Sequence, residues 1–518
     1  MVSCAVLERP GTWRVIGITV GLLLAFAPAV PLLFAAGVQN GGGSMLGGNF
    51  GAALGRSFAV AAAVALLTVG IGLPTGVLAG LSDFPLRSFL LALLALPLLV
   101  PSFLWAIGIS MLRTSSGMSA TSFLSGYSGA VIAFVAVGLP LVFFVSLLST
   151  RGISRGQADA ARLAGGESNL FRHALRSVSP TAAVAGVLGG VLTLADPGPG
   201  QILGYNGAGF AILTSFAAQY DFGLAARQCL MLSALVVVIV LPVVVLLAPR
   251  FAASLLARDV APLAPIRAPL TNWLAPVLLF SIIIFTVVLP ATGLIAPVLR
   301  DFPAARVAQE VRRTLPNTLV YAAAASGIAT ILGFALALIA GRERRLRAIL
   351  LAAAVVLFAL PSSFGALGIL HAGTAAPATL DFLFRSKFAA SAGLAMHCLP
   401  LAVIVAMRSI GTTSPSWANA AAVHGVPLRL YFGRILVPHL LPAMLLAALL
   451  CALIATADVS TILLLHPPGE TSLPLAIFTV MANAPESLVG ALCLAYLGGA
   501  AVLMCLAAAL ARFARDTS

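Results

Sequence analysis

The chain has 518 residues, of which 61% are hydrophobic and only 8% are charged, and its mean hydropathy is +1.09. Soluble domains carry about 25% charged residues, so this composition excludes an ordinary water-soluble protein and indicates a chain built for lipid. The net charge of +14 is distributed between apolar runs. We therefore interpret it as a membrane-topology signal and expect no nucleic-acid partner.

Apolar runs near the ~20 residues that a helix needs to cross a bilayer recur along the whole chain. In the first half they cover residues 14–37, 57–80, 90–112, 128–150, 181–203 and 226–248. In the second half they cover residues 274–297, 317–340, 350–371, 389–408, 443–465 and 488–510. These runs predict an all-α membrane protein with about twelve transmembrane helices. The first run is too long for the apolar core of a signal peptide, so we expect it to be retained.

The sequence repeats at a step of about 260 residues. The equivalent pairs are Trp13 and Trp273, Pro101 and Pro361, Gly108 and Gly368, and Pro140 and Pro400. An internal period of this length indicates two copies of one structural unit. We predict two six-helix repeats, residues 1–255 and 256–518. Six is an even number, so the repeats should run parallel about an axis along the membrane normal.

Arginine placement predicts the orientation. With the N-terminus in the cytoplasm, most of the 29 basic residues fall on the cytoplasmic side, as the positive-inside bias requires. Both termini are then cytoplasmic. The exception is an outer loop between the first two runs of the second half, for which the sequence offers no explanation. Its basic residues are Arg300, Arg306, Arg312 and Arg313.

A short polar motif occurs once in each predicted half, between the fourth and fifth apolar runs. The first copy contains Asp159, Ala160, Ala161 and Gly165. The second contains Asn419, Ala420, Ala421 and Gly425, followed by Phe432 and Pro438. Alanines permit close approach and glycine turns the chain, which predicts a helix–glycine–helix elbow that lies in a partner's groove. An ordinary amphipathic connector is the alternative, and the second occurrence disfavours it.

These motifs resemble the EAA loop of bacterial ABC importer permeases, especially the fused twelve-helix permeases for iron(III), thiamine and related substrates. Asn419 departs from the usual glutamate, and Pro180 in the first copy comes two residues early. The resemblance implies a multi-pass protein of the bacterial inner membrane. It also implies two cytoplasmic ATPase subunits, which bind the ATP, and an extracytoplasmic solute-binding protein. The motif residues would be the ATPase-coupling residues.

Asp196 and Asp458 are the acidic residues within apolar runs, and they lie late in the fifth run of each half. An ionisable residue at membrane depth is costly and therefore suggests a function. The two acids could face a path between the halves, suited to a small cation such as iron(III) or thiamine. They could equally cap broken helices. His371 and His397 also lie near apolar runs, and we interpret them as helix-contact residues.

The sequence contains no phosphate-binding loop of the type G-x-x-x-x-G-K-[ST], so we expect neither an enzyme nor a cofactor of its own. The six cysteines show no paired spacing, which favours small core residues over a metal or disulfide set. The leading hypothesis is a pore-forming importer subunit. A secondary transporter with two parallel six-helix halves is the first alternative. A membrane-embedded enzyme is the second, and the sequence shows no convergent polar residues for it.

Overall fold

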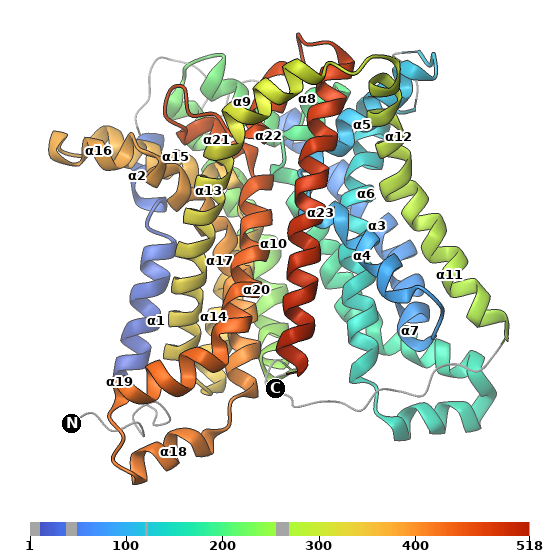
Figure 1. Cartoon of the computed structure of the whole chain (residues 1–518), viewed down its shortest axis with the longest axis vertical. Coiled ribbons are helices and arrows are strands. Elements are labelled where there is room, and N and C mark those ends of the chain that lie inside the picture. The colour runs from blue at the N-terminus through green and yellow to red at the C-terminus, as the bar shows by residue number, and fades with distance from the viewer. Residues whose placement is uncertain (1–10, 38–48, 120–122, 255–268, 517–518) are drawn as a thin grey trace.

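The computed structural model describes residues 11–37, 49–119, 123–254 and 269–516, and these residues form helices joined by short connections without any strand (Figure 1). The helices up to residue 254 are α1 (Thr12–Ala25), α2 (Ala29–Gly37), α3 (Phe50–Leu81), α4 (Arg87–Leu99), α5 (Ser102–Ser115), α6 (Gly126–Ser149), the 3-10 turn η2 (Thr150–Gly152), α7 (Arg155–Ala195), α8 (Gly198–Leu203), α9 (Ala208–Ala217) and α10 (Phe222–Ser254). The predicted boundary between residues 255 and 256 lies outside the described residues.

The helices from residue 269 onward complete the bundle. They are α11 (Pro269–Ile283), the π turn η3 (Ile284–Val288), α12 (Leu289–Arg300), α13 (Ala304–Ala340), α14 (Arg344–Ala359), α15 (Ser362–Ala375), the 3-10 turn η4 (Ala378–Leu380), α16 (Asp381–Phe384), α17 (Lys387–Thr412), α18 (Pro415–Val423), α19 (Leu428–Tyr431), the π turn η5 (Phe432–Leu436), α20 (Val437–Ala457), α21 (Val459–Leu465), α22 (Leu473–Val480) and α23 (Glu486–Asp516).

Nine helices in the described ranges are long and apolar enough to cross a membrane, and the count reaches twelve if each of three bent pairs is one span. The bent pairs are α1 with α2, α4 with α5, and α14 with α15, with bends of 43°, 99° and 87°. Pro101 and Pro361 stand at the two sharper bends, where a residue without a backbone N–H interrupts the helix. The chain is thus a helical multi-pass membrane protein, but the predicted runs 90–112 and 350–371 are broken helices.

The fifth apolar run of the first half also differs from the prediction. Residues 181–203 were expected to form one span, whereas α7 begins at Arg155, ends at Ala195 and is followed by the separate short helix α8. In the second half, α20 likewise ends at Ala457, before α21 begins. Both acids of the predicted substrate path therefore stand at breaks between helices.

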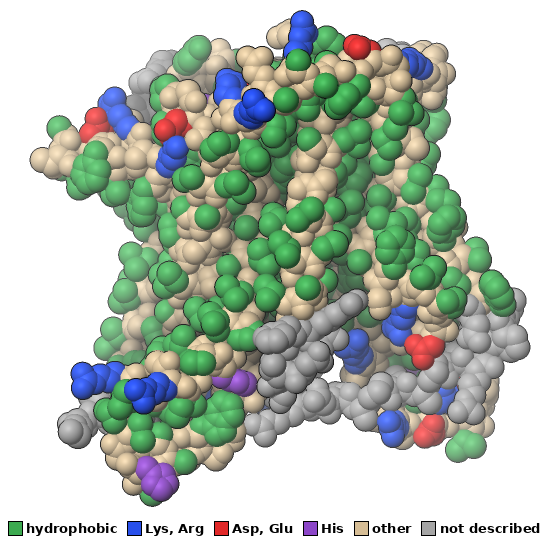
Figure 2. Space-filling model, viewed as in Figure 1, with side chains coloured by type: hydrophobic (Ala, Val, Ile, Leu, Met, Phe, Trp, Pro, Cys, Tyr) green, Lys and Arg blue, Asp and Glu red, His purple; other side chains and the backbone are tan. Residues whose placement is uncertain are grey.

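The face of the molecule seen in Figure 2 is divided into an apolar belt and two charged ends. Figure 2 shows hydrophobic side chains over the middle of the visible face, with lysine, arginine, aspartate and glutamate side chains toward its two ends. Large apolar residues such as Phe34, Leu66 and Val238 are exposed. Contiguous apolar surface of this kind belongs in lipid, where helices satisfy their own backbone hydrogen bonds.

Close backbone contacts join helices that are far apart in the sequence. A side chain at Gly108 on α5 would collide with the carbonyl oxygen of Pro290 on α12. In the same way, a side chain at Gly368 on α15 would collide with the carbonyl oxygen of Pro28, directly before α2. Small residues at such points let membrane helices approach each other closely. The N-terminal and C-terminal halves of the chain therefore pack directly on each other at two places. At one, α5 contacts α12, and at the other, the start of α2 contacts α15.

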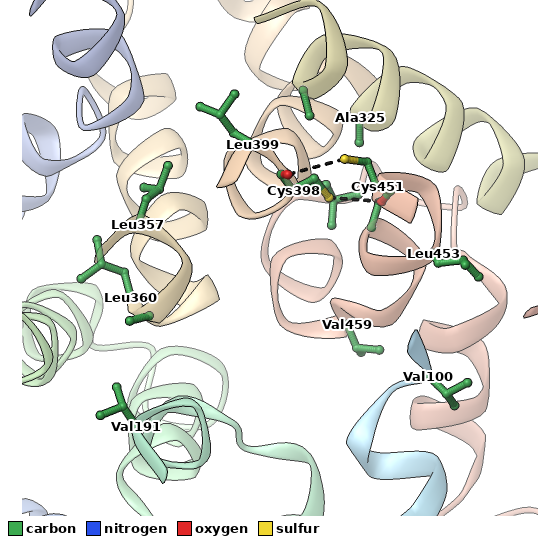
Figure 3. Close-up of a cluster of buried hydrophobic side chains, with 14 of the residues drawn as sticks. Val100, Val191, Ala325, Leu357, Leu360, Cys398, Leu399, Cys451, Leu453 and Val459 are labelled. Carbon is green, nitrogen blue, oxygen red and sulfur yellow. Dashed lines mark hydrogen bonds between the residues drawn. The ribbon is translucent and has the colours of Figure 1, made fainter. Parts of the chain in front are cut away.

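Buried cysteines contribute to the core as small residues. Cys398 on α17 and Cys451 on α20 face each other, and each thiol donates to the other residue's carbonyl oxygen, at 3.3 and 3.5 Å (Figure 3). Cys229 and Cys493 are also buried and free, whereas the free Cys505 is exposed. The predicted core role is therefore confirmed for four of the described cysteines, while Cys4 lies outside the described residues.

Candidate functional site

The first elbow, which we define as residues 154–166, opens with a helix cap. The Ser154 hydroxyl accepts from the Gln157 backbone N–H at 3.3 Å, and the Gln157 side chain accepts from the Ser154 N–H at 3.1 Å. This reciprocal pair satisfies two N–H groups at the start of α7. The elbow ends at Gly165 and Gly166, whose backbone leaves the helical region. Gly166 has φ +69°, a conformation that favours glycine.

Burial in the first elbow alternates between two faces. Ala158 and Ala161 are buried in a cluster with Ile153 and with the end of α3. Asp159 and Ala160 are exposed, and the Leu163 side chain is 90% exposed. The first elbow is thus fixed to the bundle through one face and presents its other face outward.

The second elbow, residues 414–427, has the same pattern of burial. Ala418 and Ala421 are buried, Asn419 and Ala420 are exposed, and Val423 is 84% exposed. These positions lie 260 residues after their counterparts in the first elbow. The turn after α18 places Gly425 at φ +64°, again in the region that favours glycine.

Two further residues of the motif follow the second elbow. Phe432 is half-buried at the start of the π turn η5, and Pro438 is exposed near the start of α20. Proline has no backbone N–H, and Pro438 lies just after the π turn in a helix that runs without a gap over Leu428–Ala457. Figure 1 shows both elbows at the lower end of the bundle, which we call the elbow face; the opposite end is the far face.

The two elbows differ in charge. Arg162 of the first elbow pairs with Glu167 at 3.1 Å and with Asp159 at 3.5 Å. Among the described residues, no ion pair of 4.0 Å or less occurs in the second elbow. There, Trp417 packs its edge against His439 with 4.9 Å between ring centroids. A shared shape is therefore stabilised by different local chemistry.

Asp196 and Asp458 line one cavity of about 240 Å³ between helices of the two halves of the chain. Both carboxylates also accept hydrogen bonds at the start of the helix that follows, and Asp458 is the N-cap residue of α21. Asp196 accepts from the Ser102 hydroxyl and from the Gly198 N–H, the latter at 2.9 Å. Asp458 accepts from the Thr461 hydroxyl and from its N–H, the latter at 3.0 Å. The two interpretations of these acids are thus compatible: each acid caps a break and faces a shared cavity.

Other residues of this cavity were not predicted to line it, although His397 was singled out as a helix-contact residue. Ser102 and the aromatic pair Phe358 and His397 line the cavity, and the two rings stack with 5.6 Å between centroids. The 260-residue step pairs Ser102 with Ser362, which also lines the cavity, so the repeat could have identified both serines. His371 does not line this cavity, and its buried Nε2 atom has no hydrogen-bond partner in the part of the chain that the structure describes.

A larger cavity of about 500 Å³ lies at the far face, away from both acids. It is lined by polar residues of α3, α9 and α10, among them Arg56, whose Nε donates to the Asn206 carbonyl oxygen at 3.0 Å. The basic residues of the predicted outer loop are also at this face, but the prediction of a loop was wrong: Arg300 ends α12, and Arg306, Arg312 and Arg313 lie on α13. Arg313 pairs with Glu310 there at 2.8 Å, while Arg306 and Arg312 are exposed.

The described residues contain no group of three or more His, Cys, Asp or Glu side chains that could hold a metal ion. The geometry therefore consists of two elbows on one face and a small acidic cavity between the halves. Comparisons of the chain with protein-family models, with curated proteins and with solved structures found no match.

Proposed function

We propose that the chain is the transmembrane permease subunit of a bacterial ABC importer. It forms the solute path in the inner membrane, with both termini in the cytoplasm, and couples to two cytoplasmic ATPase subunits that bind ATP. A solute-binding protein delivers the cargo from the other side. The observation that carries the proposal is the pair of elbows, which present equivalent exposed positions on one face of the bundle.

The proposal includes two parallel six-helix repeats, residues 1–255 and 256–518. Two observations support it. The elbows repeat their burial pattern at a step of 260 residues. The contacts of Gly108 with Pro290 and of Gly368 with Pro28 involve glycines at the same step. An even number of spans in the first repeat brings both elbows to the same side, where two copies of one partner can bind.

The exposed tips of the elbows suit a docking role. A single exposed apolar side chain is ordinary on a protein surface, but Leu163 and Val423 are both almost fully exposed at equivalent positions. Burial of each tip in a partner would contribute about 1.5–3 kcal/mol. The buried alanines behind the tips fix each elbow to the bundle, so a displaced tip would move α7 or α20.

The cavity supports a small cation as cargo, such as iron(III) or thiamine. Two carboxylates from different halves line it, which would lower the barrier for a cation and raise it for an anion. The same acids are the observation that favours a secondary transporter, in which they would couple ion movement to transport. Such a transporter would have no need for paired elbows that dock ATPases.

Capture of the ATPase subunits tests the proposal. We expect the double variant Leu163→Asp/Val423→Asp to lose ATPase capture from detergent extracts by at least about tenfold, because two apolar contacts are lost. Phe382→Asp, an exposed apolar residue far from both elbows, is the control and should capture normally. If wild-type protein transports solute without any associated ATPase, the importer assignment is wrong.

Uptake of a cation tests the cargo separately. Asp196→Asn and Asp458→Asn each keep the shape of the cap but remove the charge. We expect the double variant to transport thiamine or iron(III) at least about tenfold more slowly at normal expression. Normal uptake by the double variant would remove both acids from the path and leave the elbows' role intact.

A further inference from the structure

Arginines gather on the elbow face where α13 meets α14, beside the start of α1. We call them the arginine cluster; its members are Arg14, Arg342, Arg344, Arg345 and Arg347. The guanidinium of Arg14 occupies the space that a side chain at Gly341 would need, so α1 adds its charge to this turn. Glu343 is the one acidic residue within the turn.

Within the described residues, the four arginines of the turn itself, Arg342, Arg344, Arg345 and Arg347, have little charge compensation. Arg347 is 0% exposed, and its Nη atoms donate to the carbonyl oxygens of Gly341 and Met407 at 3.1 and 2.7 Å. Its Nε has no hydrogen-bond partner among the described residues. In the described part of the chain, no carboxylate pairs with Arg342, Arg344, Arg345 or Arg347. Buried charge without a counter-ion is costly, so this turn favours an external anion.

The corresponding turn between α3 and α4 provides an internal comparison. Arg87 precedes Arg347 by 260 residues, and Asp83 precedes Glu343 by the same step. Arg87 pairs with Asp83 at 3.1 Å and is the only basic residue of its turn. The first turn thus neutralises its arginine, whereas the second accumulates arginines, and Glu343 has no ion pair with any residue that the structure describes.

The arginine cluster lies next to apolar surface. Val15 and Ile16 on α1 and Ile349 on α14 are exposed, and these two helices pack against each other. Trp13 is exposed as well, with the Arg14 guanidinium 5.4 Å from its ring centroid. Tryptophan and arginine together are typical of the level where lipid headgroups meet the hydrocarbon. A ligand here would meet positive charge and apolar surface together.

We propose that the arginine cluster binds the phosphate group of an anionic phospholipid. Arg344 and Arg345 are exposed and reach the headgroup, while the acyl chains follow the apolar surface of α1 and α14. Basic pockets between membrane helices suit this chemistry, because each arginine near an anionic lipid adds to the attraction. A free phosphate shares the charge but would gain nothing from the apolar surface.

Lipid binding to the purified full-length chain tests the proposal. We expect native mass spectrometry to show that phosphatidylglycerol binds on the order of tenfold more tightly than phosphatidylcholine. The double variant Arg344→Gln/Arg345→Gln should lose most of this preference. The variant Arg172→Gln/Arg176→Gln removes the same charge from exposed positions on α7 and should keep it.

Several results would overturn the proposal. Equal binding of the two lipids, or an intact preference in Arg344→Gln/Arg345→Gln, would exclude the arginine cluster as a lipid site. A thermal unfolding measurement compares glycerol 3-phosphate with phosphatidylglycerol. If both raise the unfolding midpoint equally, the ligand is a soluble anion instead of a lipid. If Arg344→Gln/Arg345→Gln loses ATPase capture but keeps the lipid preference, the arginine cluster contacts a protein instead of a lipid. If the double variant does not fold, Arg345→Gln alone should show an intermediate preference, and an unchanged one would contradict the site.

Discussion

The first and second elbows reach one arrangement by different means. In the first elbow, the capped start of α7 ends at a kink at Gly165 and Gly166, and the Asn169 side chain donates to the Ala161 carbonyl oxygen at 3.0 Å. In the second, α18 is a separate helix, and the Val426 backbone N–H donates to the Ala421 carbonyl oxygen at 2.9 Å. The two elbows share the placement of their buried alanines and of their exposed apolar tip. The local hydrogen bonds and charges that secure it are interchangeable.

Replacement of a buried alanine by a larger residue should have the largest effect on stability, and the effect should be similar in both elbows. Ala158→Leu or Ala418→Leu forces a larger side chain into a closed space, at a cost of about 1–3 kcal/mol. We expect faster hydrogen exchange in the altered elbow and slower solute uptake. Ala160→Leu and Ala420→Leu, at exposed positions, should leave exchange unchanged. Unchanged exchange in the buried variants would mean that the alanines do not fix the elbows.

Removal of the helix cap should affect the stability of the first elbow more than that of the second. Ser154→Ala deletes the acceptor for the Gln157 N–H and should destabilise the first elbow by about 1 kcal/mol. The Ser414 side chain makes no cap hydrogen bond, so Ser414→Ala should have a smaller effect on the second elbow. Hydrogen exchange at the backbone N–H groups of residues 155–158 and 416–418 measures both changes. Equal effects would show that the cap does not distinguish the elbows.

The ion pairs of Arg162 should contribute least. Arg162→Gln removes two partly exposed pairs, which are worth about 0–1 kcal/mol in total once solvent screens them. We expect the first elbow of the wild-type chain to exchange slightly faster in high salt and the variant to be insensitive to salt. The second elbow serves as the control within the same molecule. Salt sensitivity of equal size in both elbows would contradict this role for Arg162.

The sequence predicted the positions of the apolar segments better than the direction of the helix axis within each segment. Composition identifies a run that can enter lipid, but it does not report the direction of a helix axis. Pro101 and Pro361 were visible as equivalent prolines, yet a proline can either kink a continuous helix or end it. The bends of 99° and 87° depend on the packing of α5 and α15 against other helices, which is information from outside each run.

The candidate site was predictable only as far as the repeat extends. The 260-residue step selected the elbow residues and the two acids, because each has a counterpart in the other half. It did not show which alanines are buried: Ala160 and Ala161 are adjacent in sequence but lie on opposite faces. Phe358 and His397 were not recognised as cavity residues because their counterparts, Leu98 and Val137, have different chemistry.

The reciprocal contacts of Gly108 with Pro290 and of Gly368 with Pro28 interlock the molecule. Each half inserts its opening segment into a surface supplied by the other, so neither half completes its own packing alone. Separation would therefore require the two exchanged segments to be withdrawn together. The covalent chain behaves in this respect as a dimer with swapped arms, and two polypeptides made separately from it should assemble only in each other's presence.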